Sequence, residues 1–506
     1  MYEIIIGGLD TYIGLQQILL TAAGVFMGII IGVLPGIGPL LGVILLTPVV
    51  IHLPTVAGMA LLIAIYVGGS CGGAISAVLL RIPGTPIAAA TLLDGYPMAE
   101  KGKAPQAVGL AISASSIGGM ISGIVLVFVS PLLAKIALKF GPPEYFSLTL
   151  IGMISIAVVA QESTLKGLLS ACFGLIVASI GTDPFTGFDR FTFGYGNLMG
   201  GIRLVALLVG LFAVSEMFIQ IERGGLNLKP DIKAFRPPLS TILTVLKNGV
   251  NLVRSSFIGT FIGSLPGVGG VASAFISYAM AKASSKEPEK FGTGIEEGII
   301  ASEAANNATC GGALIPTLAL AIPGDPIAAV LLGALMLIGL LPGPELFRSY
   351  PDVVGGLFYA YIGANILLLI LGLLFTPIFV SILKVRKNRL IPMIFLLSVI
   401  GTFAVQASLF DIWCMWFFGL VGYVMRKRGF PLPPFVIARV LGPILEPAFR
   451  RSLILSGGSF SIFVSRPLSL IILIVAAILL TWTVVPTEKV KQIGGPIWNR
   501  TKKRAS

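Results

Sequence analysis

Two pairs of glycine- and proline-rich signatures carry the residues of this sequence that are best suited to bind a ligand through the backbone. Residues 32–38 read GVLPGIG and residues 263–269 read GSLPGVG, while residues 71–89 (CGGAISAVLLRIPGTPIAA) resemble residues 310–329 (CGGALIPTLALAIPGDPIAA). Proline and glycine interrupt helical hydrogen bonding within these apolar runs. In lipid, a broken backbone persists only where it is buried in protein or lines a cavity. Two broken segments at matching positions in two halves indicate a transporter's binding site.

The chemistry that such breaks offer is the binding of anions. A helix N-terminus compensates negative charge through unpaired N–H groups and the positive end of its dipole. Glycine lets the backbone approach a ligand, and Pro86 and Pro326 suit the first turn of a new short helix. Unwound carbonyls opposite such N-termini could hold Na⁺. A single turn of this kind often only lets helices kink and pack, but the four together favour a substrate site. The predicted substrate-binding residues of the breaks and the segments before them are Gly36, Gly38, Ser70, Gly72, Gly73, Gly84, Thr85, Gly267, Gly269, Gly311, Gly312 and Gly324.

The densest group of polar residues inside an apolar segment is EEGIIASEAANNATCGG at 296–312. Polar side chains in lipid are costly unless they are paired, so they mark functional positions. Glu303 and Asn307 are four residues apart and share a helix face, with Asn306 beside them. Asn306, Asn307 and Thr309 therefore join the predicted substrate-binding residues, and Glu303 is a candidate for ion coupling.

Four charged residues lie near the breaks or in apolar segments, and two of them leave alternatives open. Asp325 is either a helix cap or a second ion-coupling residue. Arg81 either pairs with a substrate carboxylate or extends towards the membrane surface. Arg203 and Glu216 are expected to form a packing or interface pair within one span.

The composition predicts an all-α polytopic membrane protein of the cell membrane. Of the 506 residues 56% are apolar and 11% are charged, whereas a soluble domain carries roughly 25% charged residues. The N-terminus lacks the basic region and cleavage site of a signal peptide, so the first apolar run is expected to be retained. The net charge of +13 comes mostly from basic loops such as 229–236, 282–290, 384–389 and 426–428. This is the positive-inside pattern rather than a nucleic-acid surface.

The sequence does not favour catalysis or a metal centre. The four cysteines lie in apolar contexts without CxxC spacing, and His52 is the one histidine, which argues against metal sites and a disulfide framework. No HExxH or Walker motif occurs. We therefore expect no enzyme activity and no cofactor beyond a coupling ion, Na⁺ or H⁺.

The apolar runs predict two membrane repeats with about 10–12 full spans and re-entrant hairpins. The expected organisation is repeat 1 at 1–221, a basic cytoplasmic linker at 222–240, repeat 2 at 241–485 and a polar basic tail at 486–506. Residues 426–466 are assigned no span. The expected spans are Leu15–Leu34, Thr55–Leu80, Gln106–Leu133, 145–160, 165–181, 198–219, 242–265, 297–320, 353–383, 390–406, 411–425 and 467–485, and the short arms are 39–51, Ile87–Leu93, 270–281 and 326–341.

Charge placement predicts that the two repeats are inverted copies. The linker and the loop 282–290 are basic and should be cytoplasmic, while the N-terminus and the turn 52–55 lack Lys and Arg and should lie outside. The basic tail disagrees with this count, so the side of the C-terminus stays open. The broken segments are expected to move as one unit against a stationary frame formed by the long helices 106–133 and 353–383, which also form the expected partner interface.

Five motifs, in order, resemble the large membrane subunit of tripartite tricarboxylate transporters. They are LPGxG, GGxxSAxLLxIPGTP, TLLDGYPMAEKGKA, EAANNAxxGGAxIP and LLGALMLxGLLPGPELF, and the similarity covers about residues 14–485. The sequence departs from the family at Ser302, where proline is frequent, and at Asp325, where a small residue is usual.

This resemblance implies a secondary transporter that takes up small organic carboxylates with a Na⁺ or H⁺ gradient. It implies two protein partners, a small four-helix membrane subunit and an extracytoplasmic substrate-binding protein. It also places substrate and ion binding at the Gly-Pro loops and the EAANNA segment. The alternative functions are a channel and a non-transporting membrane scaffold, because both tolerate glycine-rich broken helices.

Overall fold

The computed structural model describes residues 2–34, 36–159, 163–222, 234–384 and 387–484, and this part of the chain is almost entirely helical. The only sheet in these ranges pairs β1 (Gly181–Thr182) with β2 (Asp189–Arg190). Most of the linker and all of the tail predicted from the sequence lie outside the described residues. The all-α membrane architecture is confirmed.

The helices of the first half follow the predicted order. They are α1 (Tyr2–Tyr12), α2 (Leu15–Val33), α3 (Gly38–Val50), α4 (Thr55–Leu80), the 3₁₀ turn η1 (Pro86–Ala89), α5 (Leu92–Met98), the π-turn η2 (Ala99–Lys103), α6 (Ala104–Ala137), α7 (Pro142–Val159), α8 (Thr164–Ala178), α9 (Gly196–Met199), α10 (Leu204–Leu208), the π-turn η3 (Val209–Val214) and α11 (Ser215–Glu222). The expected short arm Ile87–Leu93 is wrong as one element, because the chain forms η1 there and then begins the separate helix α5.

The second half repeats this order and adds a helix that the sequence did not predict. Its elements are α12 (Ser240–Lys247), α13 (Gly249–Gly263), α14 (Gly269–Ser284), the 3₁₀ turn η4 (Pro288–Lys290), α15 (Glu296–Leu320), α16 (Pro326–Leu337), α17 (Pro344–Ser349), α18 (Pro351–Ile382), α19 (Lys387–Ala404), α20 (Leu409–Lys427), α21 (Leu432–Leu455), α22 (Ile462–Ser465) and α23 (Pro467–Val484). Helix α21 contains Pro443 and Pro447. Proline counts against a helix in sequence, yet packed neighbours in a membrane bundle can satisfy the carbonyls that it frees.

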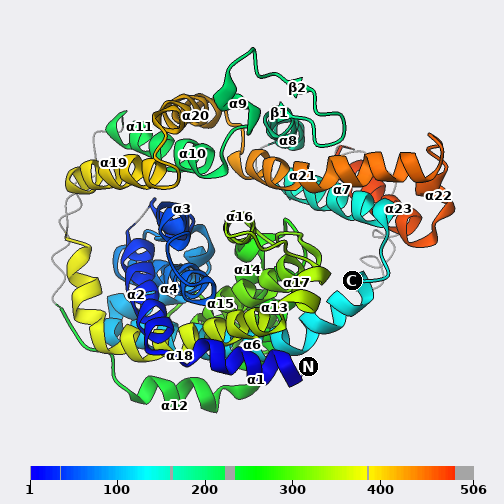
Figure 1. Ribbon diagram of the computed structural model, residues 1–506. Helices are drawn as coiled ribbons and strands as arrows, with labels where there is room; N and C mark the ends of the chain where they lie inside the picture. The colour runs from blue at the N-terminus through cyan, green and yellow to red at the C-terminus, as the bar shows by residue number, and fades with distance from the viewer. Residues whose placement is uncertain (1, 35, 160–162, 223–233, 385–386, 485–506) are drawn as a thin grey trace.

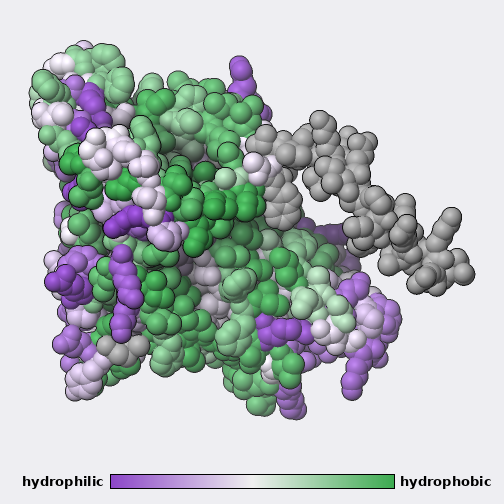
Figure 2. Space-filling view, turned by 90° about the vertical axis from the view of Figure 1, so that its right-hand side faces the viewer, coloured by the Kyte–Doolittle hydropathy of each residue, from purple (hydrophilic) through white to green (hydrophobic). Residues whose placement is uncertain are grey.

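The helices are long and apolar enough for a multi-pass membrane protein. Within the described residues, seven helical segments meet the length and composition of a membrane span, and five shorter helices are also apolar. Figure 2 shows one side of the molecule on which apolar residues cover most of the surface, while hydrophilic residues gather mainly towards the margins.

The helices form two bodies, which Figure 1 shows one above the other. The core block contains α1–α6 and α12–α18, and its closest packing joins α2 to α4, α6 to α15 and α13 to α15. The outer layer contains α7–α11 and α19–α23. Both sequence halves contribute to each body, since α7 and α8 pack on α21 while α10 and η3 pack on α20.

The long helices α6 and α18 belong to the same body as the broken segments. Helix α6 packs on α15, and α18 packs on α1, α2, α4 and α6. The sequence predicted that these helices would form a frame separate from the breaks. The structure instead places the boundary between the core block and the outer layer, because small residues let α6 and α18 approach their neighbours closely. Ala304 of α15, for example, lies against Gly118 of α6.

The local geometry of the two halves agrees at both breaks. Helices α4 and α15 each end on a left-handed residue, Arg81 (φ 57°) and Ala321 (φ 58°). Their partners α2 and α13 approach them through glycines, since a Cβ at Gly28 or Gly259 would collide with backbone of the facing helix. The opposite orientation of the halves in the membrane stays a prediction.

We expect cysteine labelling to reveal that inverted orientation. His52 and Lys286 are exposed at the two turns in question. Cys172 is exposed whereas Cys71, Cys310 and Cys414 are buried, so a Cys172→Ser background removes the accessible native thiol. His52→Cys should react with an impermeant maleimide from outside, and Lys286→Cys only from inside. Labelling of both positions from the same side would contradict the inverted-repeat prediction.

Candidate functional site

All four breaks converge on one cavity of about 700 Å³ between the core block and the outer layer. Backbone from the start of α3 and α14, from η1 and from the start of α16 forms one wall. Helix α11 and the α20–α21 connection form the opposite wall. The predicted site residues that line this cavity are Gly36, Gly38, Thr85, Gly267, Gly269, Gly324 and Asp325.

Four glycines give this wall its exposed backbone. Gly36 (φ 89°) precedes α3 and Gly38 (φ 68°) is its first residue; Gly267 (φ 86°) precedes α14 and Gly269 (φ 74°) is its first residue. Side chains other than glycine rarely adopt this left-handed backbone. A Cβ added at Gly38 or Gly269 would meet no atom within 4 Å. The N-termini of α3 and α14 therefore face open space at the cavity wall and suit a negatively charged group.

The two second-half breaks are joined directly. The Gly267 N–H donates to the Gly324 carbonyl at 3.1 Å. The Asp325 carboxylate accepts from the Ala328 N–H at 2.7 Å and from the Tyr66 hydroxyl of α4. Asp325 therefore caps α16, which is one of the two roles left open by the sequence, and its position on the cavity wall leaves the second role possible.

The first-half break is chemically different at the same position. Thr85 precedes η1 as Asp325 precedes α16. Its side chain is 2% exposed, and its hydroxyl has no hydrogen-bond partner in the described structure. The cavity therefore carries a carboxylate on one side and a hydroxyl on the other.

The opposite wall contributes an ion pair that the sequence did not predict. Arg426 of α20 lies 2.6 Å from Glu216 of α11, and Gln220 donates to the same carboxylate at 3.0 Å. The expected pairing of Arg203 with Glu216 is wrong, because Arg203 bonds to Asp411 at 2.6 Å. The signal in the sequence was Glu216, an acidic residue within an apolar segment. Its partner Arg426 lies in the second half of the chain, in a run that was assigned to a cytoplasmic loop.

Glu303 lies inside the core block rather than on the cavity wall. It is fully buried and accepts from Ser115 at 2.7 Å, from Asn306 at 3.1 Å and from the Thr91 hydroxyl. The Asn306 amide also donates to the Ser70 carbonyl at 3.1 Å, while its own oxygen has no partner in the described structure. This polar cluster joins α15 to α4, α6 and the residue before α5.

Asn307 and Thr309 connect α15 to other helices. Asn307 donates to Asn365 of α18 at 3.0 Å, and Thr309 donates to Ser273 of α14 at 2.8 Å. Asn307 was expected to bind substrate, but its side chain bonds to Asn365 of α18. Neither residue lines the cavity, so the structure gives both a role in packing.

The remaining predicted glycines pack helices together. Cβ atoms at Gly72 and Gly312 would collide with the Ile29 and Thr260 carbonyls, and one at Gly73 would collide with Thr85. A Cβ added at Gly311 would collide with Ser122 and Tyr361, and one added at Gly84 would collide with the Gly32 carbonyl. The structure therefore separates the predicted residues into a cavity wall and a buried support. Ser70, Gly72, Gly73, Gly84, Glu303, Asn306, Asn307, Thr309, Gly311 and Gly312 belong to the support.

Arg81 lies outside the cavity lining. It is exposed at the end of α4, and its guanidinium stacks over the Tyr96 ring at 5.4 Å from the centroid. Pairing with a substrate carboxylate inside this cavity does not fit that position.

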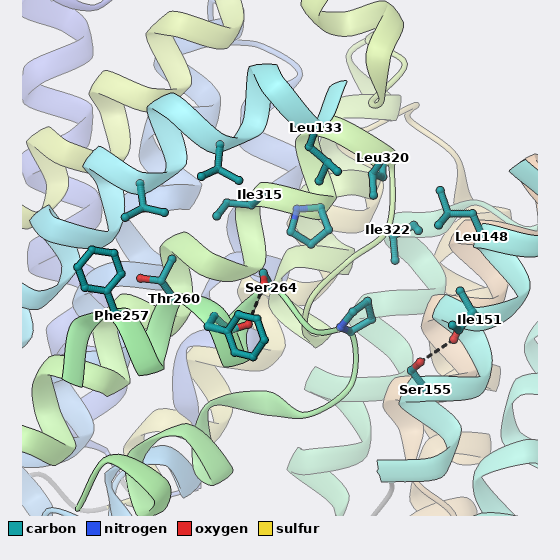
Figure 3. A pocket seen from close by; sticks show the side chains of 15 residues that line it. Leu133, Leu148, Ile151, Ser155, Phe257, Thr260, Ser264, Ile315, Leu320 and Ile322 are labelled. Carbon is teal, nitrogen blue, oxygen red and sulfur yellow. Dashed lines mark hydrogen bonds between the residues drawn. The ribbon is translucent and has the colours of Figure 1, made fainter. Parts of the chain in front are cut away.

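A second cavity, of about 470 Å³, is unsuited to an anion. It lies between α6, α13 and α15 of the core block and α7 of the outer layer, and Figure 3 shows that its lining is mostly aliphatic and aromatic. Ser155 and Ser264 donate to carbonyls of their own helices at 2.7 Å, drawn as dashed lines in Figure 3. Charged residues do not occur in its lining, so it matches a lipid chain better than a carboxylate.

The comparisons with known proteins agree with the architecture. Residues 18–437 match the model of the tripartite tricarboxylate transporter TctA family. A protein of Agrobacterium vitis described as an uncharacterized 52.8 kDa protein in the TAR-I ttuC' 3' region is 34% identical over 497 residues, which cover 96% of both chains. A second protein of that organism, described as an uncharacterized protein in the TAR-II ttuC' 3' region, is 34% identical over 234 residues, which cover 46% of this chain and 97% of the relative. No solved structure matches the chain. The family match over most of the chain, together with a full-length relative, shows that this multi-pass cell-membrane protein belongs to the TctA family, the large subunit of tripartite tricarboxylate transporters.

Proposed function

We propose that this protein is the permease subunit of a binding-protein-dependent secondary transporter that takes up a small organic di- or tricarboxylate. The observation that carries this proposal is the convergence of four broken segments on one cavity of about 700 Å³. Two helix N-termini and bare glycine backbone on its wall favour an anion, and the volume suits a small molecule. The family supports transport rather than catalysis.

The substrate carboxylates bind, in this proposal, against the starts of α3 and α14. Gly38 and Gly269 leave the backbone accessible there. Arg426 on the facing wall is already paired with Glu216, so the starts of α3 and α14 are the groups that remain to bind the carboxylates.

Transport is proposed to move the core block relative to the outer layer. The cavity lies at the boundary of these bodies, and the apolar cavity of Figure 3 marks the same boundary elsewhere. A Na⁺ or H⁺ gradient supplies the driving force, with Glu303 and Asp325 as the candidate coupling residues. An elevator or rocking motion around a site between two repeats is frequent among secondary transporters.

The proposed partners are a small four-helix membrane subunit and an extracytoplasmic substrate-binding protein. The family name includes a tripartite system, so the large subunit is not expected to accumulate substrate alone. The exposed apolar surface of α18, which includes Ile366, Ile370 and Leu374, is the proposed contact for the small subunit or for lipid.

We expect reconstituted vesicles to distinguish transport from the alternatives. Vesicles that contain this chain and the two proposed partner proteins should accumulate labelled succinate or citrate only when a Na⁺ or H⁺ gradient is imposed. A channel would equilibrate the label without a gradient, and a scaffold would give no flux above protein-free vesicles. Either result would contradict the proposed function.

A further inference from the structure

We propose that the coupling ion is a proton and that Asp325 takes it up when the substrate carboxylate enters the cavity. This inference rests on the proposed function and deepens it, since it names the ion and the atom that binds it. Asp325 is the acidic residue of the cavity wall that the broken segments themselves supply, and Glu216 on the facing wall is already paired with Arg426.

Asp325 has the contacts of a carboxylate that is stable while the cavity holds no anion. Its oxygens accept from the Ala328 N–H at 2.7 Å and from the Tyr66 hydroxyl. The positive end of the α16 dipole adds to the stabilisation of the charged form. Asp325 has no ion-pair partner among the salt bridges of the described chain. Its charge is thus balanced only by dipoles.

A second carboxylate in the same cavity removes this balance. Asp325 is 5% exposed, so water screens its charge poorly. Two carboxylates that share a poorly solvated site cannot both remain ionised, and one of them takes up a proton. Protonation of Asp325 leaves the substrate anion with the helix N-termini of α3 and α14. The transported unit is then the substrate together with one proton.

The charged and titratable groups around Asp325 are few. Tyr66 of α4 and Cys310 of α15 are its buried neighbours on the helices packed behind it. The segment α3, which also packs on α16, contains no ionisable side chain. Arg439 of α21 donates to the Ile202 carbonyl, and Arg426 on the facing wall is held by Glu216. Among the described residues that line this cavity, Arg426 is the one cation, and because Glu216 already holds it, the lining offers no further cation to balance a second carboxylate.

Asp325 suits this role better than Glu303. Glu303 is enclosed by three hydrogen-bond donors and does not line the cavity, so an entering anion does not touch it.

The test measures proton uptake during binding. Succinate is titrated calorimetrically into the purified transporter at pH 7.0–8.5 (roughly the range in which an unperturbed Asp and the succinate carboxylates are ionised), in two buffers of different ionisation enthalpy. We expect uptake of about one proton per succinate. The affinity should fall about tenfold for each unit that the pH rises, which is the slope of one linked proton.

Asp325→Asn keeps a capping side chain and should bind succinate without proton uptake and with an affinity independent of pH. Asp10→Asn, the same change at an exposed position, should behave like the wild type.

Transport gives a second readout. In vesicles that also contain the two proposed partner proteins, a pH gradient should drive succinate accumulation by the wild type, while Asp325→Asn should retain succinate exchange and lose accumulation. Three results would each overturn the inference. The first is proton-independent binding by the wild type, and the second is accumulation driven by Na⁺ at equal pH. The third is loss of proton uptake in Glu303→Gln but not in Asp325→Asn. Absence of binding and exchange of both succinate and citrate in the wild type would instead contradict the proposed function itself.

Discussion

Gly269→Ala is expected to lower succinate or citrate transport about tenfold while the protein stays folded. Gly269 lies at the start of α14 with φ 74°, and a Cβ there would enter open space at the cavity wall. The added methyl separates a carboxylate from the N-terminal N–H groups of α14, and a loss of 1.4 kcal/mol (approximately the value of one weakened charged hydrogen bond) corresponds to a tenfold loss of affinity. Alanine in this left-handed backbone conformation lowers the free energy of unfolding by about 1 kcal/mol. The measurement is initial uptake in vesicles together with thermal unfolding.

Gly339→Ala provides the matched control. Gly339 has φ 82° and no atom within 4 Å of an added Cβ, but it does not line the cavity. The two variants should lose similar stability, while only Gly269→Ala loses uptake. Equal uptake by both would show that the start of α14 does not contact the substrate. Gly119 of α6 is unsuitable as a control, because a Cβ there would collide with Asn365, the partner of Asn307.

Replacement of Glu303 by alanine is expected to destabilise the protein by about 3 kcal/mol or more. The change leaves a cavity and removes the shared acceptor of Thr91, Ser115 and Asn306, which are all buried. Each buried polar group without a partner costs about 1–3 kcal/mol, and the truncated volume adds to this loss. Thermal unfolding in detergent should show a large decrease in Tm and a low yield of monodisperse protein.

Glu303→Gln separates the polar contacts from the charge. The amide oxygen still accepts from Ser115 or Thr91, so we expect most of the lost Tm to return. Glu297→Gln, on the same helix but only partly buried, should change Tm little. A Tm of Glu303→Ala equal to the wild type would contradict the cluster's structural role, and it would indicate that water enters this part of the core block.

The sequence by itself determined the membrane class, the element order and the location of the breaks. Helix α2 ends at Val33 and α3 begins at Gly38, as the GVLPGIG signature indicates, and α13 and α14 repeat the pattern. These features depend on local physics, since Pro and Gly act within one helical turn and apolar runs need only their own length to span lipid. The two proline residues of α21 show where local preference fails, because tertiary neighbours decide whether a proline ends a helix.

Only the tertiary structure decided which polar residues of the site face open space. Gly269 and Asp325 line the cavity, whereas Asn306 and Asn307 are buried in helix contacts although the sequence presents all four as site residues. The Glu216–Arg426 pair joins positions far apart in the chain, so no local pattern indicated it. Helical periodicity shows which residues share a face, but not whether the facing element is a helix or a cavity. That difference arises when α4 and α15 pack inside the core block and the outer layer closes over the breaks.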